Sequence, residues 1–275
     1  MTPSPTRQTG VEVDTIPGSG GECEGRGLKK WWIPVDGLKT QCRSGNVGVG
    51  GIPVVLVHGL VISSLYMEPL ARCLSATHEV HALDLPGFGG SEGPRRALTI
   101  PQLAEFALRW MTAAAVDRCH LVANSLGCQI AAHMAVNAPN RIATLTLIGA
   151  TIDPSAHRLP TQVIRLMRDA VREPPRLWMK WVYDFCRAGW RRAVATTRAM
   201  FADYIEDQLM RITCPTLIIR GETDPTMPRA WGERAAELLL RGELVVIARQ
   251  PHCAHFTVPA KVAELVRKQA EKGAA

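Results

Sequence analysis

The sequence predicts an α/β fold in which a mostly parallel sheet of eight strands is covered by helices on both faces. Short apolar runs alternate along the chain with segments of helical periodicity, a pattern typical of parallel sheets. The run at 52–57 is continuously apolar, as expected for a strand buried on both faces. The 275 residues are 47% hydrophobic and 21% charged, an ordinary composition for a globular protein with a sizeable core.

The first 27 residues are rich in Pro, Thr, Gly and Ser and have few large apolar side chains. They cannot bury enough surface to offset the entropy of ordering, so we predict a disordered tail at 1–27. Asp36-Gly37 lies between two strand-like segments and indicates a β-hairpin. The strands are expected at 30–35, 39–43, 52–57, 79–83, 119–123, 142–148, 216–220 and 243–247, and the core helices at 65–76, 100–115, 126–137, 229–240 and 259–270.

A long helical stretch, residues 152–210, interrupts the alternation and divides the core into 28–151 and 211–275. Seven of the fifteen aromatic residues lie between 178 and 204. We interpret the stretch as a helical lid and expect Trp178, Trp181 and Phe185 to bind substrate. The alternative is that these rings only attach the insertion to the core.

The net charge is +7, and residues 155–200 alone hold ten Lys or Arg against three Asp or Glu. No basic tail exists, so we expect no nucleic-acid partner. A solvated Arg-rich face is the simplest interpretation of the excess, and an anion- or membrane-facing lid is the alternative.

No transmembrane span or secretory signal is visible, and the eight cysteines contain no C-x-x-C pair. Reduced thiols and a cytoplasmic enzyme are therefore expected. Cys128 and Cys253 flank candidate catalytic residues, but we interpret both as small buried side chains.

Ser125 lies where a predicted strand ends and a predicted helix begins. A serine faces outward there only on a sharp turn, which tolerates only small residues two positions before and after it. Ala123 and Gly127 meet this requirement, so the segment has the pattern of a nucleophile elbow.

Two backbone N–H groups are candidates for stabilising a developing oxyanion. His58-Gly59 follows the strand at 52–57, where a glycine turn would leave the amide of Leu60 facing the site. The amide of Leu126 begins the helix after Ser125. Together they would form an oxyanion hole.

Asp224 and His252 each follow a predicted strand at the same sheet edge, so Ser125, Asp224 and His252 occur in the order nucleophile, acid, base. The histidine would take the proton of serine, and the carboxylate would fix its tautomer. Asp153, after the strand at 142–148, is the rival acid. Asp84 lies in a glycine-rich loop and is expected to be structural.

These motifs resemble the α/β-hydrolase superfamily over about residues 29–275. The resemblance rests on HG at 58–59, DLPGFGGSEGP at 84–94, ANSLG at 123–127, RGETDPTMP at 220–228 and PHCAHFTVP at 251–259. Relatives have G-H-x-x-H-x-E-x-P at the last motif, so Pro251 and Thr257 depart from it. The resemblance implies that His252 is the base and that His255 has a packing role.

The expected function is therefore a serine hydrolase, a carboxylesterase, that cleaves an ester of a small to medium apolar substrate through an acyl-enzyme. It would need no cofactor and no metal. The alternatives are a C–C bond hydrolase of ring-fission products, an acyltransferase or thioesterase, and a non-catalytic receptor on the same scaffold.

Overall fold

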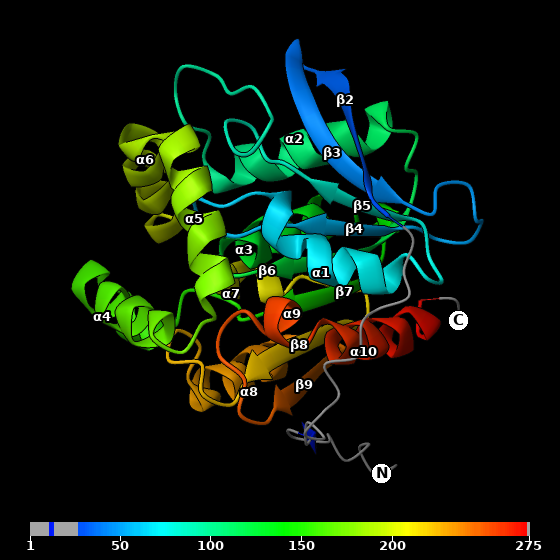
Figure 1. The fold of residues 1–275 in the computed structure, drawn as a ribbon. Helices are drawn as coiled ribbons and strands as arrows, with labels where there is room; N and C mark the ends of the chain where they lie inside the picture. Colours follow the sequence, from blue (N-terminus) through cyan, green and yellow to red (C-terminus); the bar gives the residue numbers. More distant parts are fainter. Residues whose placement is uncertain (1–10, 14–26, 274–275) are drawn as a thin grey trace.

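One sheet of nine strands runs through the part of the chain that the computed structural model describes, residues 11–13 and 27–273 (Figure 1). Its order is β1-β9-β8-β7-β6-β4-β5-β3-β2. The hairpin strand β3 runs antiparallel to β2 and β5, and all other neighbours are parallel. The strands are β1 (Val11–Val13), β2 (Lys29–Val35), β3 (Leu38–Gly45), β4 (Val54–Val57), β5 (Val80–Leu83), β6 (Cys119–Asn124), β7 (Ile142–Ile148), β8 (Thr216–Gly221) and β9 (Gly242–Ile247).

Alternate residues of the central strands supply two separate cores, one on each face of the sheet. In β4, Val55 and Val57 face one core while Val54 and Leu56 face the other. The first core packs against α2 (Ile100–Ala113), α3 (Leu126–Asn137), α7 (Ile205–Leu209) and α8 (Arg229–Leu238). The second packs against α1 (Ser64–Leu74), α9 (Ala254–Thr257) and α10 (Pro259–Glu271). The sequences of the central strands are continuously apolar because both faces of these strands are covered.

Between β7 and β8 the chain leaves the sheet and forms helices at one side of the molecule (Figure 1). These are α4 (Leu159–Ala170), α5 (Pro175–Ala188) and α6 (Trp190–Phe201), followed by α7. Pro174 ends the connection after α4, and the proline at the first position of α5 suits a helix start. We refer to residues 152–210 as the insertion.

All eight strands expected from the sequence are present, and the doubly covered parallel sheet is confirmed. The ninth strand, β1, lies within the segment predicted as a disordered tail. The remainder of that segment, residues 1–10 and 14–26, lies outside the described residues, so the prediction of a disordered tail stays a prediction.

One prediction about the cysteines is wrong. Six cysteines in the described part of the chain are free, but Cys73 is disulfide-bonded. No nearby cysteine marks Cys73 in the sequence, so local spacing carries no signal of this bond.

Candidate active site

Ser125 has the backbone conformation of a tight strand-to-helix turn. Its φ is 55° and its ψ is −125°, a region that non-glycine residues rarely adopt. A Cβ at Gly127 would lie 2.7 Å from the carbonyl oxygens of Val57 and His58, closer than packing permits. The requirement for a small residue at 127 therefore comes from the close approach of β4 to the helix.

His252 and Asp224 come together at the edge predicted from the strand order. The Nδ1 of His252 lies 2.8 Å from Oδ2 of Asp224 and 2.7 Å from Oγ1 of Thr226. Oδ1 of Asp224 accepts from the Thr226 N–H, the Thr226 hydroxyl and the Met227 N–H. Asp224 is 1% exposed and His252 is 5% exposed. The acid therefore holds the ring through Nδ1 and leaves Nε2 as the nitrogen available for proton transfer.

The two groups shift each other's pKa in opposite directions. Burial alone lowers the pKa of His252, but Asp224, with Asp169 and Glu173, outweighs burial and raises that pKa to about 9. Burial raises the pKa of Asp224, but His252 and the Thr226 hydrogen bonds outweigh it and hold that pKa below its ordinary value. The pair therefore favours an ionised carboxylate beside the ring.

Ser125 and His252 are both positioned by the end of β7. The N–H of Ser125 donates to the carbonyl of Ile148 at 2.9 Å. The next residue, Gly149, has a φ of 58°, and a Cβ there would lie 2.6 Å from Cε1 of His252. Only a glycine leaves room for the ring. Gly149 is not among the residues predicted from the sequence, because its role depends on a contact between distant segments.

The His58-Gly59 turn is tied to the serine elbow by a buried chain of hydrogen bonds. The Gly59 N–H donates to the hydroxyl of Tyr66, which donates to Oδ1 of Asn124, both at 2.7 Å. Nδ2 of Asn124 donates to the Ile148 carbonyl. A Cβ at Gly59 would lie 3.1 Å from Cβ of Ser125. Leu60 follows this turn, so its backbone lies beside the elbow.

The His58 side chain supports the same turn and is itself structural. Its Nε2 accepts from the Leu85 N–H at 3.0 Å, so its Nδ1 donates to the Gly59 carbonyl at 2.9 Å. Burial lowers the pKa of His58 and keeps the ring neutral. Asp84 has the structural role expected for it, since it accepts from Gln41, Ser64 and Gly90.

The rival acid, Asp153, is bound elsewhere. Its Oδ1 accepts from the N–H and hydroxyl of Ser155, and its Oδ2 pairs with Arg165 at 2.8 Å. Both oxygens thus stabilise the start of the insertion, while Asp224 holds the histidine.

Two buried carboxylates of the insertion reach the loop that carries His252. Oδ1 of Asp169 accepts from the His252 N–H at 3.0 Å, and Oε1 of Glu173 accepts from the Cys253 N–H at 2.7 Å. Burial raises the pKa of Asp169, and burial together with Asp169 raises that of Glu173 to about 7. Neither carboxylate is among the site residues predicted from the sequence. The one signal that singles them out is that residues 155–200 contain only three acidic residues.

The three aromatic residues expected to bind substrate form one cluster on α5. Trp181 stacks on Phe185 with ring centres 5.2 Å apart, and Trp178 meets Trp181 edge-on at 6.0 Å. Nε1 of Trp178 donates to the Ala170 carbonyl at the end of α4, and Trp181 packs against the second core. Packing against the core and against α4 therefore explains the positions of Trp181 and Trp178, as the alternative interpretation of these rings expected.

The remaining histidine and cysteine candidates are buried. His255 lies edge-on to Tyr66 at 4.6 Å, and burial lowers its pKa to about 3. Burial raises the pKa of the Cys128 and Cys253 thiols. Within 11–13 and 27–273, no group of three or more His, Cys, Asp or Glu side chains is arranged to hold a metal ion.

Comparison with known proteins gives one family and several relatives. The model of the alpha/beta hydrolase family matches residues 54–265. A 2-hydroxy-6-oxononadienedioate/2-hydroxy-6-oxononatrienedioate hydrolase of Cupriavidus pinatubonensis is 26% identical over 254 residues, covering 80% of this chain and 86% of that relative. The dihydrolipoyllysine-residue acetyltransferase component of the acetoin cleaving system of Cupriavidus necator is 34% identical over 118 residues. That match covers 42% of this chain and 30% of the relative, so the chain spans less than a third of its length.

Among solved structures, a thermophilic esterase from Thermogutta terrifontis is 21% identical, with a TM-score of 0.74. The match covers 90% of this chain and 100% of the esterase. At this identity the likeness concerns the fold.

Proposed function

Because the chain belongs to the alpha/beta hydrolase family, we propose that it is a serine hydrolase that cleaves carboxylic esters of small to medium apolar substrates. The observation that carries the proposal is the buried Asp224–His252 pair together with the strained turn of Ser125, which the end of β7 connects through Ile148 and Gly149. This combination is what activation of a serine hydroxyl requires.

In the proposed reaction, Oγ of Ser125 attacks the ester carbonyl carbon while Nε2 of His252 takes the hydroxyl proton. The N–H groups of Leu60 and Leu126 bind the negative oxygen of the tetrahedral intermediate. One such donor is worth about 3–4 kcal/mol of the barrier in comparable enzymes. The intermediate expels the alcohol, which receives the proton from His252. Water then attacks the acyl-enzyme by the same route, releases the acid and restores Ser125.

Trp178, Trp181 and Phe185 are proposed to line the acyl side of the site. The proposed partner is a small-molecule ester, and the scheme uses no cofactor. A cytoplasmic location stays a prediction from the sequence, and the disulfide at Cys73 removes part of its basis.

Hydrolysis of a carbon–carbon bond in a ring-fission product is the second candidate. It is favoured by Asn124 directly before the serine and by the relative that is named for a 2-hydroxy-6-oxo dienedioate. The same serine, histidine and oxyanion donors would serve either reaction.

A fluorophosphonate probe and a substrate panel test the proposal. Wild-type protein should be labelled covalently, and Ser125→Ala should lose both labelling and turnover while keeping its thermal unfolding midpoint. p-Nitrophenyl esters of increasing chain length, run beside a ring-fission dienoate, decide between the two candidates. A folded wild-type protein that neither labels nor turns over any of these substrates would contradict the proposal.

A further inference from the structure

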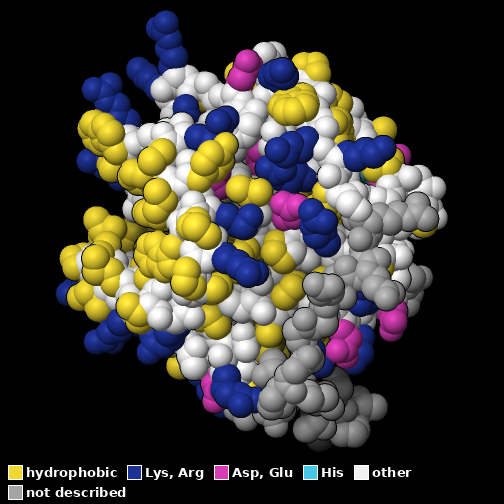
Figure 2. Space-filling view, in the orientation of Figure 1, with side chains coloured by type: hydrophobic (Ala, Val, Ile, Leu, Met, Phe, Trp, Pro, Cys, Tyr) yellow, Lys and Arg dark blue, Asp and Glu magenta, His cyan; other side chains and the backbone are white. Residues whose placement is uncertain are grey.

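The insertion presents an apolar surface to solvent. Of the eighteen large hydrophobic side chains that are exposed among the described residues, twelve lie between 159 and 194. They gather over α4, α5 and α6, at the left of the molecule in Figure 2. We call this set the apolar face: Leu159, Val163, Ile164, Leu166, Met167, Val171, Trp178, Met179, Val182, Tyr183, Trp190 and Val194. A contiguous exposed apolar surface of this kind marks an interaction site.

Helix α4 has the reverse of the usual polarity of a surface helix. The side chains that it buries are Gln162 and Asp169, which bond to backbone groups of the Ala156 and His252 segments. Its outward side carries Val163 and Met167, and Val171 directly after the helix is 85% exposed. A surface helix normally turns its apolar side to the core. The hydrogen bonds of its polar side therefore hold α4 with its apolar side outward.

The exposed charges that residues 155–200 contribute around the apolar face have a single sign. Between 155 and 200 the only acidic residues are Asp169, Glu173 and Asp184, and all three are buried. The ten Lys and Arg of the same stretch include Arg168, Arg172 and Arg176 on its exposed side. Dark blue side chains accordingly border the yellow surface in Figure 2. The face is complementary to an anionic apolar partner.

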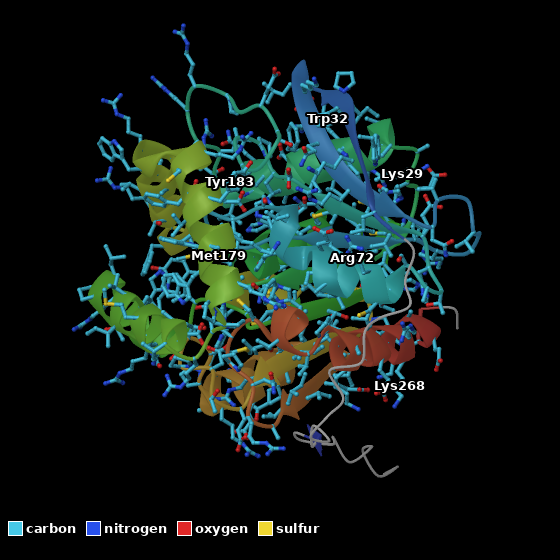
Figure 3. All side chains as sticks on the ribbon, in the orientation of Figure 1. Lys29, Trp32, Arg72, Met179, Tyr183 and Lys268 are labelled. Carbon is cyan, nitrogen blue, oxygen red and sulfur yellow. The ribbon has the colours of Figure 1, made fainter. Side chains whose placement is uncertain are left out.

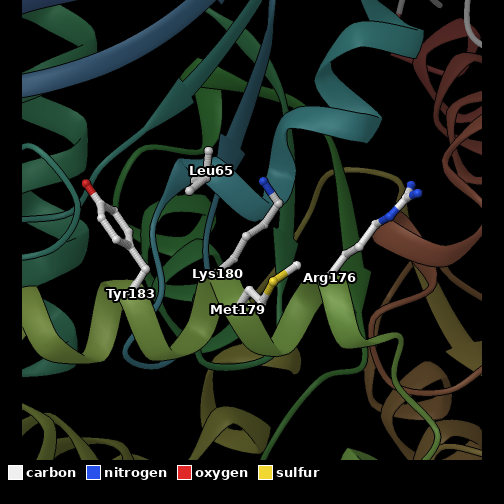
Figure 4. Close-up of a pocket in the computed structure, with 5 residues that line it drawn as sticks. All are labelled: Leu65, Arg176, Met179, Lys180 and Tyr183. Carbon is white, nitrogen blue, oxygen red and sulfur yellow. The ribbon is translucent and has the colours of Figure 1, made fainter.

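An open pocket of about 480 Å³ lies where α5 meets the start of α1. Its lining combines two cations one turn apart, Arg176 and Lys180, with Tyr183, Met179 and Leu65. In Figure 4, Arg176, Lys180 and Tyr183 rise from the same side of α5, the side on which Leu65 lies. This lining suits a phosphate group attached to an apolar tail.

We propose that the apolar face, with the Arg176–Lys180 pocket at its border, docks the protein on the surface of an anionic phospholipid bilayer. The exposed Tyr183 and Trp190 are aromatic residues of the type that gathers at membrane–water interfaces. No helix of the described residues is long and apolar enough to cross a membrane. The protein would lie on the bilayer with its apolar side chains in the headgroup region.

A second copy of the chain fits the apolar face less well than an anionic bilayer does. Two copies that met through this face would bring the exposed arginines of one copy, such as Arg168, Arg172 and Arg176, toward those of the other, with no exposed carboxylate of this stretch between them. Like charges across an interface are repulsive, whereas an anionic bilayer attracts them.

Vesicle flotation tests the proposal. Full-length protein should float with vesicles of mixed phosphatidylcholine and phosphatidylglycerol, and should release when the ionic strength is raised. Pure phosphatidylcholine should bind it much more weakly. Each lost cation near the surface should lower the partition constant about fivefold, so R168Q/R172Q/R176Q should lower it by about two orders of magnitude.

Matched variants separate the face from overall charge and hydrophobicity. K29Q/K30Q/R241Q removes the same three positive charges from elsewhere on the molecule. Its partition constant should stay within about twofold of the wild-type value. Figure 3 labels Lys29 and Met179 on opposite sides of the view. Met179 and Leu240 are both 65% exposed, so Met179→Gln should weaken flotation while Leu240→Gln should not.

Three outcomes would overturn the proposal. One is equal binding to both vesicle types, and another is an equal loss in the two triple variants. The third is a stable dimer in light scattering that Met179→Gln dissociates, which would assign the face to a second copy. Soluble glycerol phosphate should displace part of the protein from anionic vesicles, because it competes with the lipid headgroup for the pocket. If the protein binds glycerol phosphate but binds both vesicle types equally, the first of these outcomes, the pocket is a free-phosphate site and the bilayer is not its occupant.

Discussion

Gly149 is the residue at which a single methyl group should most directly disturb the site. Its Cα faces the His252 ring, and an added Cβ would overlap Cε1 and Nδ1. We expect Gly149→Ala to displace the ring from Asp224 and to lower kcat by at least a hundredfold, the size of loss that a small misplacement of a catalytic group causes.

Gly189→Ala is the matched control for that substitution. Gly189 also has a positive φ, 78°, but a Cβ there meets nothing within 4 Å. Gly189→Ala should lose about 1–3 kcal/mol of stability from backbone strain, because its φ of 78° and ψ of 152° lie in a region almost restricted to glycine. Gly149→Ala should also lose stability, because its φ is positive. Kinetics and thermal unfolding on the two proteins distinguish the effects, because only Gly149→Ala should lose kcat. Equal kcat in both would contradict the role assigned to Gly149.

The pH dependence of kcat/KM tests the role proposed for His252. In the proposed reaction the ring must be neutral to accept a proton from Ser125, so activity should rise as pH rises through its pKa. Since Asp224, Asp169 and Glu173 outweigh burial and raise that pKa to about 9, the midpoint should lie well above the value of about 6.5 of an isolated histidine.

Glu173→Gln should move this midpoint to lower pH, because it removes a negative charge that favours the protonated ring. Glutamine retains an oxygen that can accept from the Cys253 N–H, so the loop should keep its shape. Glu233→Gln, on the exposed side of α8, is the control and should leave the profile unchanged. Rate profiles of the three proteins from neutral to alkaline pH measure the effect. An unshifted midpoint in Glu173→Gln would count against the electrostatic link.

At the scale of elements, the insertion is fastened to the core by buried carboxylates. Asp169 and Glu173 bind the His252 loop, and Asp184 on α5 accepts from the Ser63 hydroxyl at the start of α1. The acidic side chains of this stretch therefore face inward. Breaking a buried charged hydrogen bond typically costs several kcal/mol, so these contacts fix where α4 and α5 lie relative to the His252 loop and α1.

The aromatic cluster of α5 gives a prediction about substrate choice. If Trp181 and Phe185 line the acyl pocket, replacing either with alanine should lower kcat/KM about fourfold for each methylene that loses its contact, since burying one CH₂ is worth about 0.8 kcal/mol. The loss should be small for acetyl esters and large for medium chains.

Trp190→Ala, on the exposed side of α6, should leave the chain-length profile unchanged. Measuring kcat/KM over a series of p-nitrophenyl esters tests all three variants. A uniform loss for every ester in Trp181→Ala and Phe185→Ala, with lower thermal stability, would instead assign these rings to packing against the core.

At the scale of the whole molecule, the fold and the meeting of His252 with Asp224 could be predicted because they follow from periodicity and strand order. Parallel strands end at one edge, so residues after β8 and β9 had to meet there. The contacts of Gly149, Asp169 and Glu173 could not be predicted, since each reaches a distant segment; the scarcity of acidic residues between 155 and 200 only singles out the two carboxylates. The outward apolar side of α4 was also hidden, because periodicity shows that a helix has two sides but not which side is buried.

The pairing of β1 with β9 bears on how the protein can be shortened. Val11–Val13 occupies the outer edge of β9, with Val11 opposite Val245 and Val13 opposite Ile247. A variant without residues 1–27 would expose the backbone N–H and C=O groups of β9, an open template for strand addition and aggregation. The opposite edge, β2, carries the exposed Lys29 and Lys30 together with Pro34, which discourage such pairing. In size-exclusion chromatography the shortened protein should therefore show more high-molecular-weight aggregate than the full chain. An unchanged elution profile would show that the exposed edge of β9 does not cause aggregation.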